Sequence, residues 1–226
     1  VVFNAEGEVT AIGEESGLVR VAGGDNPDAV APDQFIEENV VEPVAEYTAG
    51  LAANVIAVSE VALEGRREPG IRTNFVSIVP AIPRGQFKEI MENAVSAVEN
   101  ADGRFAQISG FSMVYDPDGT PQVLDDDLNV VTPGTRVRSI ILDTGEVIVA
   151  DGAVVPGEAI NIATIDFSAS GGDMYPYRGA RFTTLGVVYQ RALFNYIVDP
   201  VVEGGLGGVR SAAEYPEGGE GRITSA

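Results

Sequence analysis

The chain of 226 residues carries 14 basic and 34 acidic side chains, which gives a formal net charge of −20, and it contains neither Cys nor His. Without Cys there is no disulfide framework, thiolate nucleophile or Cys-based zinc site, and without His there is no Ser-His-Asp triad or imidazole-ligated metal. A field of this sign repels nucleic acid and anionic membranes, so binding to a nucleic-acid duplex is not expected. Any chemistry must therefore rest on carboxylates, arginines, aromatic rings and the backbone.

Length and composition predict a globular chain of one domain, or of one domain with a connecting segment. Hydrophobic residues make up 45% of the chain, which is enough to fill an ordinary core. No apolar stretch approaches the roughly 20 residues that a membrane span needs, and an export signal is expected to lie outside these residues. Two explanations of the acidity stay open, namely solubility in a salty medium and cation binding by Asp125, Asp126 and Asp127.

The first quarter of the chain is predicted to hold short strands, a linker and a helix. Residues 1–22 alternate apolar residues with glycine turns, which is typical of a strand ribbon, and the Gly- and Pro-bearing residues 23–32 are typical of a linker. Pro32 suits the first position of a helix over residues 32–49, which Pro43 should kink or break. The apolar side chains of that helix share one face: Phe35, Ile36, Val40, Val44 and Tyr47.

Beyond this helix, strands and helices follow one another without regular alternation, which predicts an α+β fold. Apolar spacing of three and four residues favours helices over residues 84–99 and from Thr183 or Thr184 to Ile197. Asp143-Thr144-Gly145 predicts a tight hairpin. Strands are expected at residues 55–63, 75–79, 105–115, 136–142, 146–150 and 159–165, and the glycine-rich tail from residue 203 is expected to be largely loop.

Two segments stand out by their order of residues. The first runs from Asp102 through Phe105 to Gly110, and the second runs from a strand through Phe167 to Gly171-Gly172-Asp173. Between them, Pro133-Gly134-Thr135-Arg136-Val137 precedes the hairpin. This order resembles the C-terminal domain of the 5'-nucleotidase family, which includes bacterial UDP-sugar hydrolases and animal ecto-5'-nucleotidases. The resemblance covers roughly residues 32 to 226 and implies a mixed-sheet α+β domain of that type.

The resemblance implies that Phe105 and Phe167 sandwich a nucleobase and that Asp173 lies near the base and ribose. An aromatic clamp is worth about 1–3 kcal/mol per stacked base and tolerates many bases. The double glycine allows a close approach of the backbone to a ligand, and a carboxylate accepts hydrogen bonds from sugar hydroxyls. From the residues alone, a Phe at a strand end is more often part of a core, and Gly-Gly-Asp is commonly only a turn.

A third correspondence is the run from Val61 to Arg67, followed by Ile71-Arg72-Thr73. The resemblance implies that Arg72 faces the phosphate side of the substrate, where a guanidinium binds oxyanions through two parallel hydrogen bonds. The alternative is a solvated loop arginine. After Thr73 the family expects a helix, a strand and an asparagine-triple-glycine loop, whereas this chain continues with Asn74-Phe75-Val76.

The resemblance also implies a partner domain. In the family, hydrolysis takes place at two divalent metal ions held by Asp, His and Asn ligands in an N-terminal metallophosphatase domain. We expect no cofactor and no catalytic residue in this chain, so the chain alone should be inactive. Residues 1–31 are then the last strands and the linker from that N-terminal domain, and residues 32–226 are the C-terminal-like domain.

These expectations define a nucleotide-recognition domain of an extracellular or periplasmic 5'-nucleotidase-type hydrolase. Its small-molecule partner would be a nucleotide or nucleoside, and its protein partner the metallophosphatase domain. The alternative that stays open is a catalytically inactive structural or surface module derived from such a domain. The acidity and the segment that is missing after Thr73 favour that alternative.

Overall fold

The computed structural model describes residues 1–13, 22–27, 29–60, 74–100, 102–200, 205–217 and 219–226. Contacts divide the chain into two compact units, Val1–Val55 and Ile56–Ala226. The boundary that the sequence suggests after residue 31, between a linker and a C-terminal-like domain, stays a prediction. Among the described residues, no helix is both long and apolar enough to cross a membrane.

The first unit holds a strand hairpin and a helical segment. Strands β1 (Val2–Phe3) and β2 (Val9–Ala11) pair antiparallel, as the alternation in this region predicts. The helical segment comprises α1 (Gln34–Ile36), the π-helical turn η1 (Glu37–Val41) and α2 (Glu42–Ala52).

This helical segment begins two residues later than Pro32, because the Asp33 side chain accepts a hydrogen bond from the Ile36 amide and so caps the first turn. Pro43 interrupts the regular pattern, as predicted. It occupies the first turn of α2, directly after the π-helical turn, and it supplies no backbone N–H to that turn. The predicted apolar face is exposed in the structure, with Phe35 70% and Tyr47 68% accessible.

In the second unit, a five-stranded sheet has the order β10-β9-β8-β5-β14. The strands β5 (Phe111–Tyr115), β8 (Val137–Leu142), β9 (Val147–Ala150) and β10 (Ala153–Val154) pair antiparallel, and β14 (Ile223–Ser225) joins β5 in parallel. The predicted hairpin between β8 and β9 is confirmed. The predicted strand over residues 105–115 is wrong in its first half, because residues 105–109 belong to no strand and face a pocket instead.

A second sheet has three antiparallel strands in the order β11-β4-β12. They are β4 (Phe75–Ile82), β11 (Ile160–Ile165) and β12 (Thr183–Val188). The helix predicted from Thr183 or Thr184 is wrong in its first part, because these β-branched residues pair with Ile78 and Ser77 of β4. The helix α5 begins only at Tyr189 and ends at Val198.

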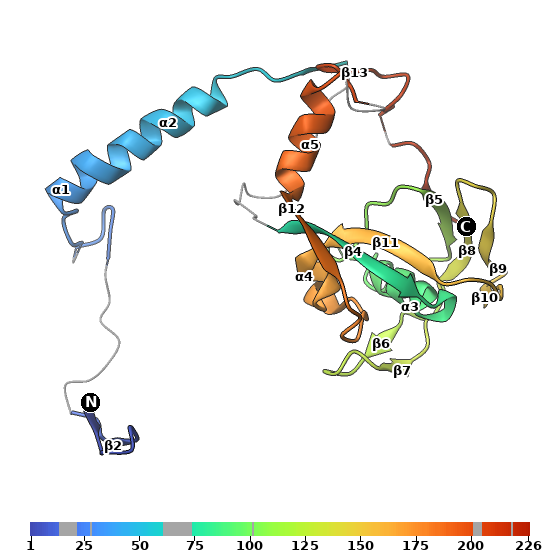
Figure 1. Ribbon diagram of the computed structural model, residues 1–226, viewed down its shortest axis with the longest axis horizontal. Helices are drawn as coiled ribbons and strands as arrows, with labels where there is room; N and C mark the ends of the chain where they lie inside the picture. Colours follow the sequence, from blue (N-terminus) through green and yellow to red (C-terminus); the bar gives the residue numbers. More distant parts are fainter. Residues whose placement is uncertain (14–21, 28, 61–73, 101, 201–204, 218) are drawn as a thin grey trace. The chain divides into compact units, whose positions relative to one another are not determined.

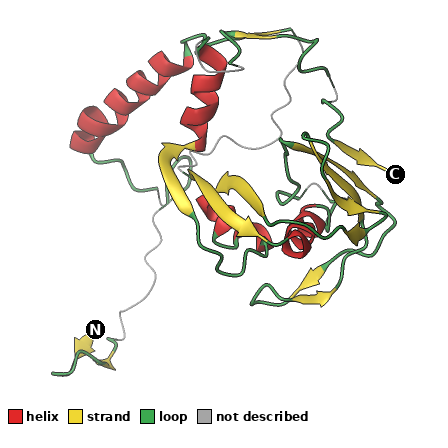
Figure 2. Cartoon of the chain, turned by 45° about the vertical axis from the view of Figure 1, so that its right-hand side comes forward, coloured by secondary structure: helices red, strands yellow, loops and turns green. Residues whose placement is uncertain are grey.

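Helix α3 (Arg84–Ala94) lies beside both sheets and joins them in one core (Figures 1 and 2). Its predicted apolar face is buried, but its regular part ends five residues before the predicted Glu99. The side chains that fill the core come from β4, α3, β5, β8 and β9: Val79, Ile82, Phe87, Ile90, Met91, Met113, Val137, Ile140, Ile148 and Val149. Mixed sheets with packed helices make the fold α+β, as predicted.

A buried carboxylate fixes α3 to the start of β8. Glu92 is 1% exposed and accepts hydrogen bonds from Lys88 Nζ at 2.6 Å and from the amides of Arg136 and Val137 at 3.1 Å each. Gly134 makes room for it, since a Cβ there would lie 2.4 Å from Glu92 Oε2. The Pro-Gly motif before the hairpin therefore has a packing role.

The remaining elements are short. Strand β3 (Val58–Ser59) pairs in parallel with β13 (Val209–Arg210). The strand predicted over residues 55–63 is therefore too long at its start, because residues 55–57 belong to no strand, and residues 61–63 lie outside the described residues. Strands β6 (Val123–Leu124) and β7 (Val130–Thr132) form a hairpin. The turn of helix α4 (Asp166–Ala169) and the 3-10 turn η2 (Gly172–Met174) follow β11 directly.

Candidate functional site

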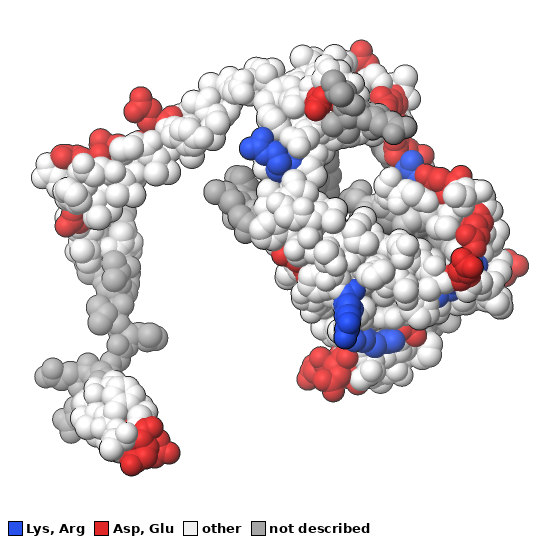
Figure 3. Space-filling model, in the orientation of Figure 1, with Lys and Arg blue, Asp and Glu red and all other residues white. Residues whose placement is uncertain are grey.

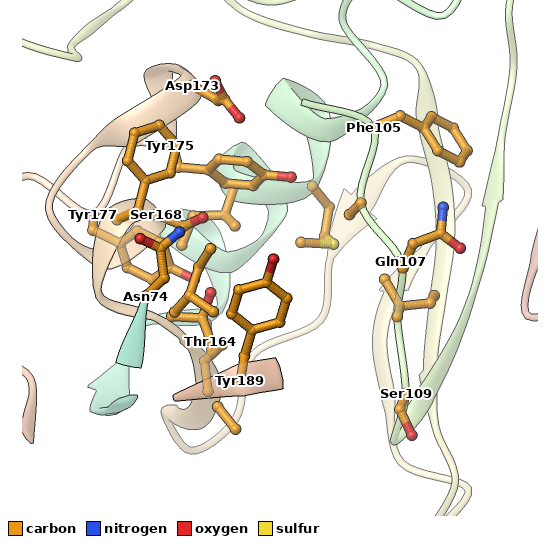
Figure 4. Close-up of a pocket in the computed structure, with 18 of the residues that line it drawn as sticks. Asn74, Phe105, Gln107, Ser109, Thr164, Ser168, Asp173, Tyr175, Tyr177 and Tyr189 are labelled. Atoms are coloured by element: carbon orange, nitrogen blue, oxygen red, sulfur yellow. The ribbon is translucent and has the colours of Figure 1, made fainter. Parts of the chain in front are cut away.

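The segment 103–109 and the β11–α4–η2 connection face each other across a pocket of about 360 Å³ (Figure 4). We call it the aromatic pocket, because two Phe and three Tyr side chains, together with the core residues Phe87 and Phe111, line it. Phe105, Phe167 and Asp173, all singled out in the sequence, are part of its lining. Arg72 lies outside the residues that the structure describes.

Phe167 is positioned by its neighbours at the end of β11. Asp166 Oδ1 accepts hydrogen bonds from the amide of Phe167 at 2.9 Å and from that of Phe75 at 3.0 Å, which ties α4 to the start of β4. The ring of Phe167 lies against Gly172, where a Cβ would be 2.5 Å from its Cε1 and Cζ atoms. A side chain here would collide with the ring, so the second glycine of the motif leaves the room that the ring occupies.

Asp173 is held in a left-handed conformation, with φ 51° and ψ 31°. Gly171 before it has φ 95°, and Met174 after it has φ 61°. Such backbone is costly for residues other than glycine and persists where the surroundings fix it. Here Asn93 Nδ2 donates a hydrogen bond of 3.0 Å to the Asp173 carbonyl oxygen, so α3 anchors the turn. The carboxylate then lies at the wall of the pocket (Figure 4).

Two tyrosines that the sequence did not single out form much of the inner wall. The Tyr175 hydroxyl donates a hydrogen bond of 2.6 Å to the Arg104 carbonyl oxygen and so links the two walls of the pocket. Burial, with smaller contributions from Tyr177 and Asp173, raises the pKa of Tyr175 far above its ordinary value. Tyr177 is 3% exposed, and burial raises its pKa as well. Both phenols stay neutral at physiological pH, which makes this wall aromatic and uncharged.

Phe105 lies on the opposite wall. In Figure 4 its ring points away from Tyr175 and Tyr177, and Gln107, two residues further along the extended segment, lies on the same side of the chain. That side also faces a second pocket of about 360 Å³, whose lining includes Phe105, Gln107, Arg210 and Tyr215. We call it the arginine pocket. Phe105 and Phe167 are 37% and 39% exposed, so both rings keep free surface for a ligand.

The residues present do not fit a two-metal centre of the kind that the family resemblance places in an N-terminal domain. The chain contains no His, so imidazole ligands are excluded throughout. Within the described part of the chain, no group of three or more Asp and Glu side chains is arranged to hold a metal ion. Asp125, in the acidic run 125–127, instead accepts hydrogen bonds from the Asp127 and Asn129 amides and from the Asn129 side chain, as in a local turn. No reaction step can be derived through a metal in this chain.

Sequence reasoning missed the tyrosines at 175 and 177 and the residues of the arginine pocket. A signal for the tyrosines exists, because Tyr175-Pro176-Tyr177 directly follows the glycine motif. For Arg210 and Tyr215 there was none, because they lie in a glycine-rich tail whose pattern indicates only loop.

Comparison with known proteins bears on the family and on the fold. Residues 85–179 match the family model of the 5'-nucleotidase C-terminal domain. The fold is similar to the crystal structure of a 5'-nucleotidase precursor from Thermus thermophilus, with a TM-score of 0.56 and 19% sequence identity over 86% of this chain. The chain spans 44% of the length of that structure. A comparison with curated proteins gave no match. The resemblance inferred from the sequence is confirmed over residues 85–179, and the α+β fold class is confirmed.

Proposed function

We propose, from the match of residues 85–179 to the 5'-nucleotidase C-terminal domain, that the chain recognises nucleotides for a phosphoester hydrolase whose catalytic centre lies in another domain. The aromatic pocket receives the nucleobase. Phe167 stacks on one face of the base, Phe105 closes over the other, and Asp173 accepts hydrogen bonds from the ribose hydroxyls.

One observation carries this proposal. Phe105 and two residues that follow it by 62 (167 − 105) and 68 (173 − 105) positions, Phe167 and Asp173, line one pocket of about 360 Å³. A base and its ribose suit a pocket of this size, since small-molecule sites span about 300–1,000 Å³ and combine apolar walls with a few polar groups. The ring of Phe105 is half-exposed, so it can turn about its Cα–Cβ bond toward a base that lies on Phe167.

The rest of the enzyme belongs to the same proposal. Two divalent ions in an N-terminal metallophosphatase domain would cleave the phosphoester, and the whole protein would act outside the cytoplasm, in the extracellular space or periplasm. Because this chain has no His, it supplies selection of the substrate rather than chemistry. Arg72 stays a candidate for the phosphate side in this proposal.

Ligand-observed NMR with adenosine tests the base site. The chain should bind adenosine, and Phe105→Ala and Phe167→Ala should each weaken the affinity by about tenfold, since a stacked base is worth about 1–3 kcal/mol. Phe35→Ala is the matched control, because Phe35 is 70% exposed and lies outside the lining of both pockets. Its affinity should equal that of the unaltered chain.

A folded sample that binds no adenosine at millimolar concentration would contradict the proposal. That result would favour the alternative of a structural or surface module derived from a nucleotidase domain. Repeating Phe105→Ala in the complete enzyme separates the cases further, because a base clamp predicts a higher KM with an intact metal centre.

A further inference from the structure

Asn74 is a polar residue of the aromatic pocket that the stacking of a base does not use. It lies directly before β4, on the same wall of the pocket as Ser168, Tyr175 and Tyr177 and opposite Phe105 (Figure 4). A side-chain amide has two donor hydrogens and one acceptor oxygen. Among the contacts of the described residues, the side-chain amide of Asn74 makes no hydrogen bond, so no described group competes with a ligand for it.

The tyrosines of the same wall are already engaged. The Tyr175 hydroxyl donates its hydrogen bond to the Arg104 carbonyl oxygen, and the Tyr177 hydroxyl is hydrogen-bonded to the Thr164 side chain. These phenols therefore support the pocket from within the protein, whereas the amide of Asn74 is free to contact a ligand. In ligand sites, a few polar groups of this kind among apolar walls fix the orientation of the ligand and provide specificity.

The backbone fixes Asn74 relative to the ring of Phe167. The Asn74 carbonyl oxygen accepts a hydrogen bond of 3.0 Å from the Tyr189 amide. One atom, Asp166 Oδ1, accepts hydrogen bonds from the amide of Phe75 at 3.0 Å and from that of Phe167 at 2.9 Å. The residue after Asn74 and the proposed stacking residue are thus tied to the same carboxylate oxygen. Such support holds an amide and a stacking face in a set geometry before the ligand arrives.

The chemistry of an amide suits one edge of adenine. An amide presents its N–H donor and its C=O acceptor side by side, and adenine presents its 6-amino donor beside a ring nitrogen acceptor, so the two groups form a pair of hydrogen bonds. We propose that the Asn74 side chain reads this edge of the base that stacks on Phe167, and so directs the pocket to adenine nucleotides. This proposal rests on the proposed function and deepens it by naming the class of substrate.

The experiment compares adenosine with purine riboside by isothermal titration calorimetry. The two nucleosides differ only in the 6-amino group, so both can stack on Phe167. The unaltered chain should bind adenosine about fivefold more tightly, as expected for one additional hydrogen bond. Asn74→Leu, which has a similar size and no polar atoms, should abolish this preference and lower the purine riboside affinity by at most about threefold. Binding of purine riboside by Asn74→Leu is also the check that this variant keeps its fold.

Two further variants separate reading of the base from a structural role of Asn74. Asn74→Asp should keep the preference for adenosine, because a carboxylate still accepts a hydrogen bond from the 6-amino group. Gln107→Leu is the matched control, since Gln107 carries the same amide on the opposite wall, where its side chain lies on the same side of the chain as the Phe105 ring (Figure 4). The preference for adenosine should persist in Gln107→Leu.

The two proposals fail in different ways. Equal affinities for adenosine and purine riboside in the unaltered chain overturn the role of Asn74 and leave the base site standing. A preference that survives Asn74→Leu, or that is lost in Asn74→Asp or Gln107→Leu, overturns the role of Asn74 as well. Absence of binding for both nucleosides in a folded sample overturns the proposed function and the role of Asn74 together.

Discussion

Replacing Gly172 by Ala tests whether the glycine motif serves the ligand through Phe167. A Cβ at this position would lie 2.5 Å from Cε1 and Cζ and 2.6 Å from Cε2 of the Phe167 ring. Carbon atoms pack at about 3.5–4.0 Å, so the ring must move by about 1 Å. Because the ring is 39% exposed, it can swing outward, and we expect a loss of stability of about 1 kcal/mol, at the low end for an overpacked site.

The effect on binding should be larger than the effect on stability. A displaced ring no longer offers a flat face to the base, so adenosine affinity should fall by about tenfold. Ligand titration by NMR measures this change, and thermal unfolding measures stability on the same samples. Gly85→Ala is the matched control, because it lies in α3 and a Cβ there meets nothing within 4 Å. It should leave the affinity unchanged.

A double-mutant cycle distinguishes this reasoning from a general disturbance of the turn. If Gly172→Ala acts through the ring, it should cost no further affinity in a Phe167→Ala background, where the clash is gone. An equal loss of affinity in both backgrounds would refute the explanation. So would a Gly172→Ala variant that binds adenosine as tightly as the unaltered chain.

Two further predictions concern stability. Glu92→Gln should destabilise the chain by about 3 kcal/mol in denaturant titrations, because it leaves the Lys88 charge and two backbone amides around a buried, neutral side chain. The control Glu89→Gln removes a half-exposed ion pair with Arg178 and should cost about 1 kcal/mol or less. Equal losses of stability in the two variants would contradict the reasoning. The melting temperature should rise between low salt and about 1 M NaCl, because 14 cations cannot pair 34 acids and salt screens the repulsion among the remaining acidic side chains. Acidic side chains lie in several separate groups on the visible face (Figure 3). A flat or falling melting temperature would show that the carboxylates are already paired with cations.

Local patterns predicted those elements whose stability depends on one buried face. Helix α3 forms where its apolar spacing predicts it, because its apolar face is buried in the core together with strands of the two sheets. The same apolar spacing wrongly predicted a helix over Thr183–Val188, because Leu185 and Val188 are three residues apart and Thr184 suits a helix cap. Pairing with β4 decided the outcome, and a long-range partner cannot be seen in a window of a dozen residues.

Some residues of the candidate site could also be predicted from the sequence, and others could not. Phe105, Phe167 and Asp173 were reached through the family resemblance, and the structure brings all three to one pocket. The reason for the double glycine was not visible in the sequence, because it depends on where the Phe167 ring lies against Gly172. Arg210 depends on the pairing of β13 with β3, about 150 positions earlier in the chain, and no local pattern encodes that contact.

The parallel pairing of β14 with β5 affects how the chain folds during synthesis. Ile223 follows its partner Met113 by 110 positions (223 − 113), and the Met113 amide donates a hydrogen bond of 2.7 Å to the Arg222 carbonyl oxygen. At about 5–20 residues per second, a ribosome needs roughly 5–20 s to make the residues between them. During that interval one edge of β5 has no strand beside it, and an unpaired edge is a template for aggregation. Chains stalled in this stretch should therefore be clients for chaperones.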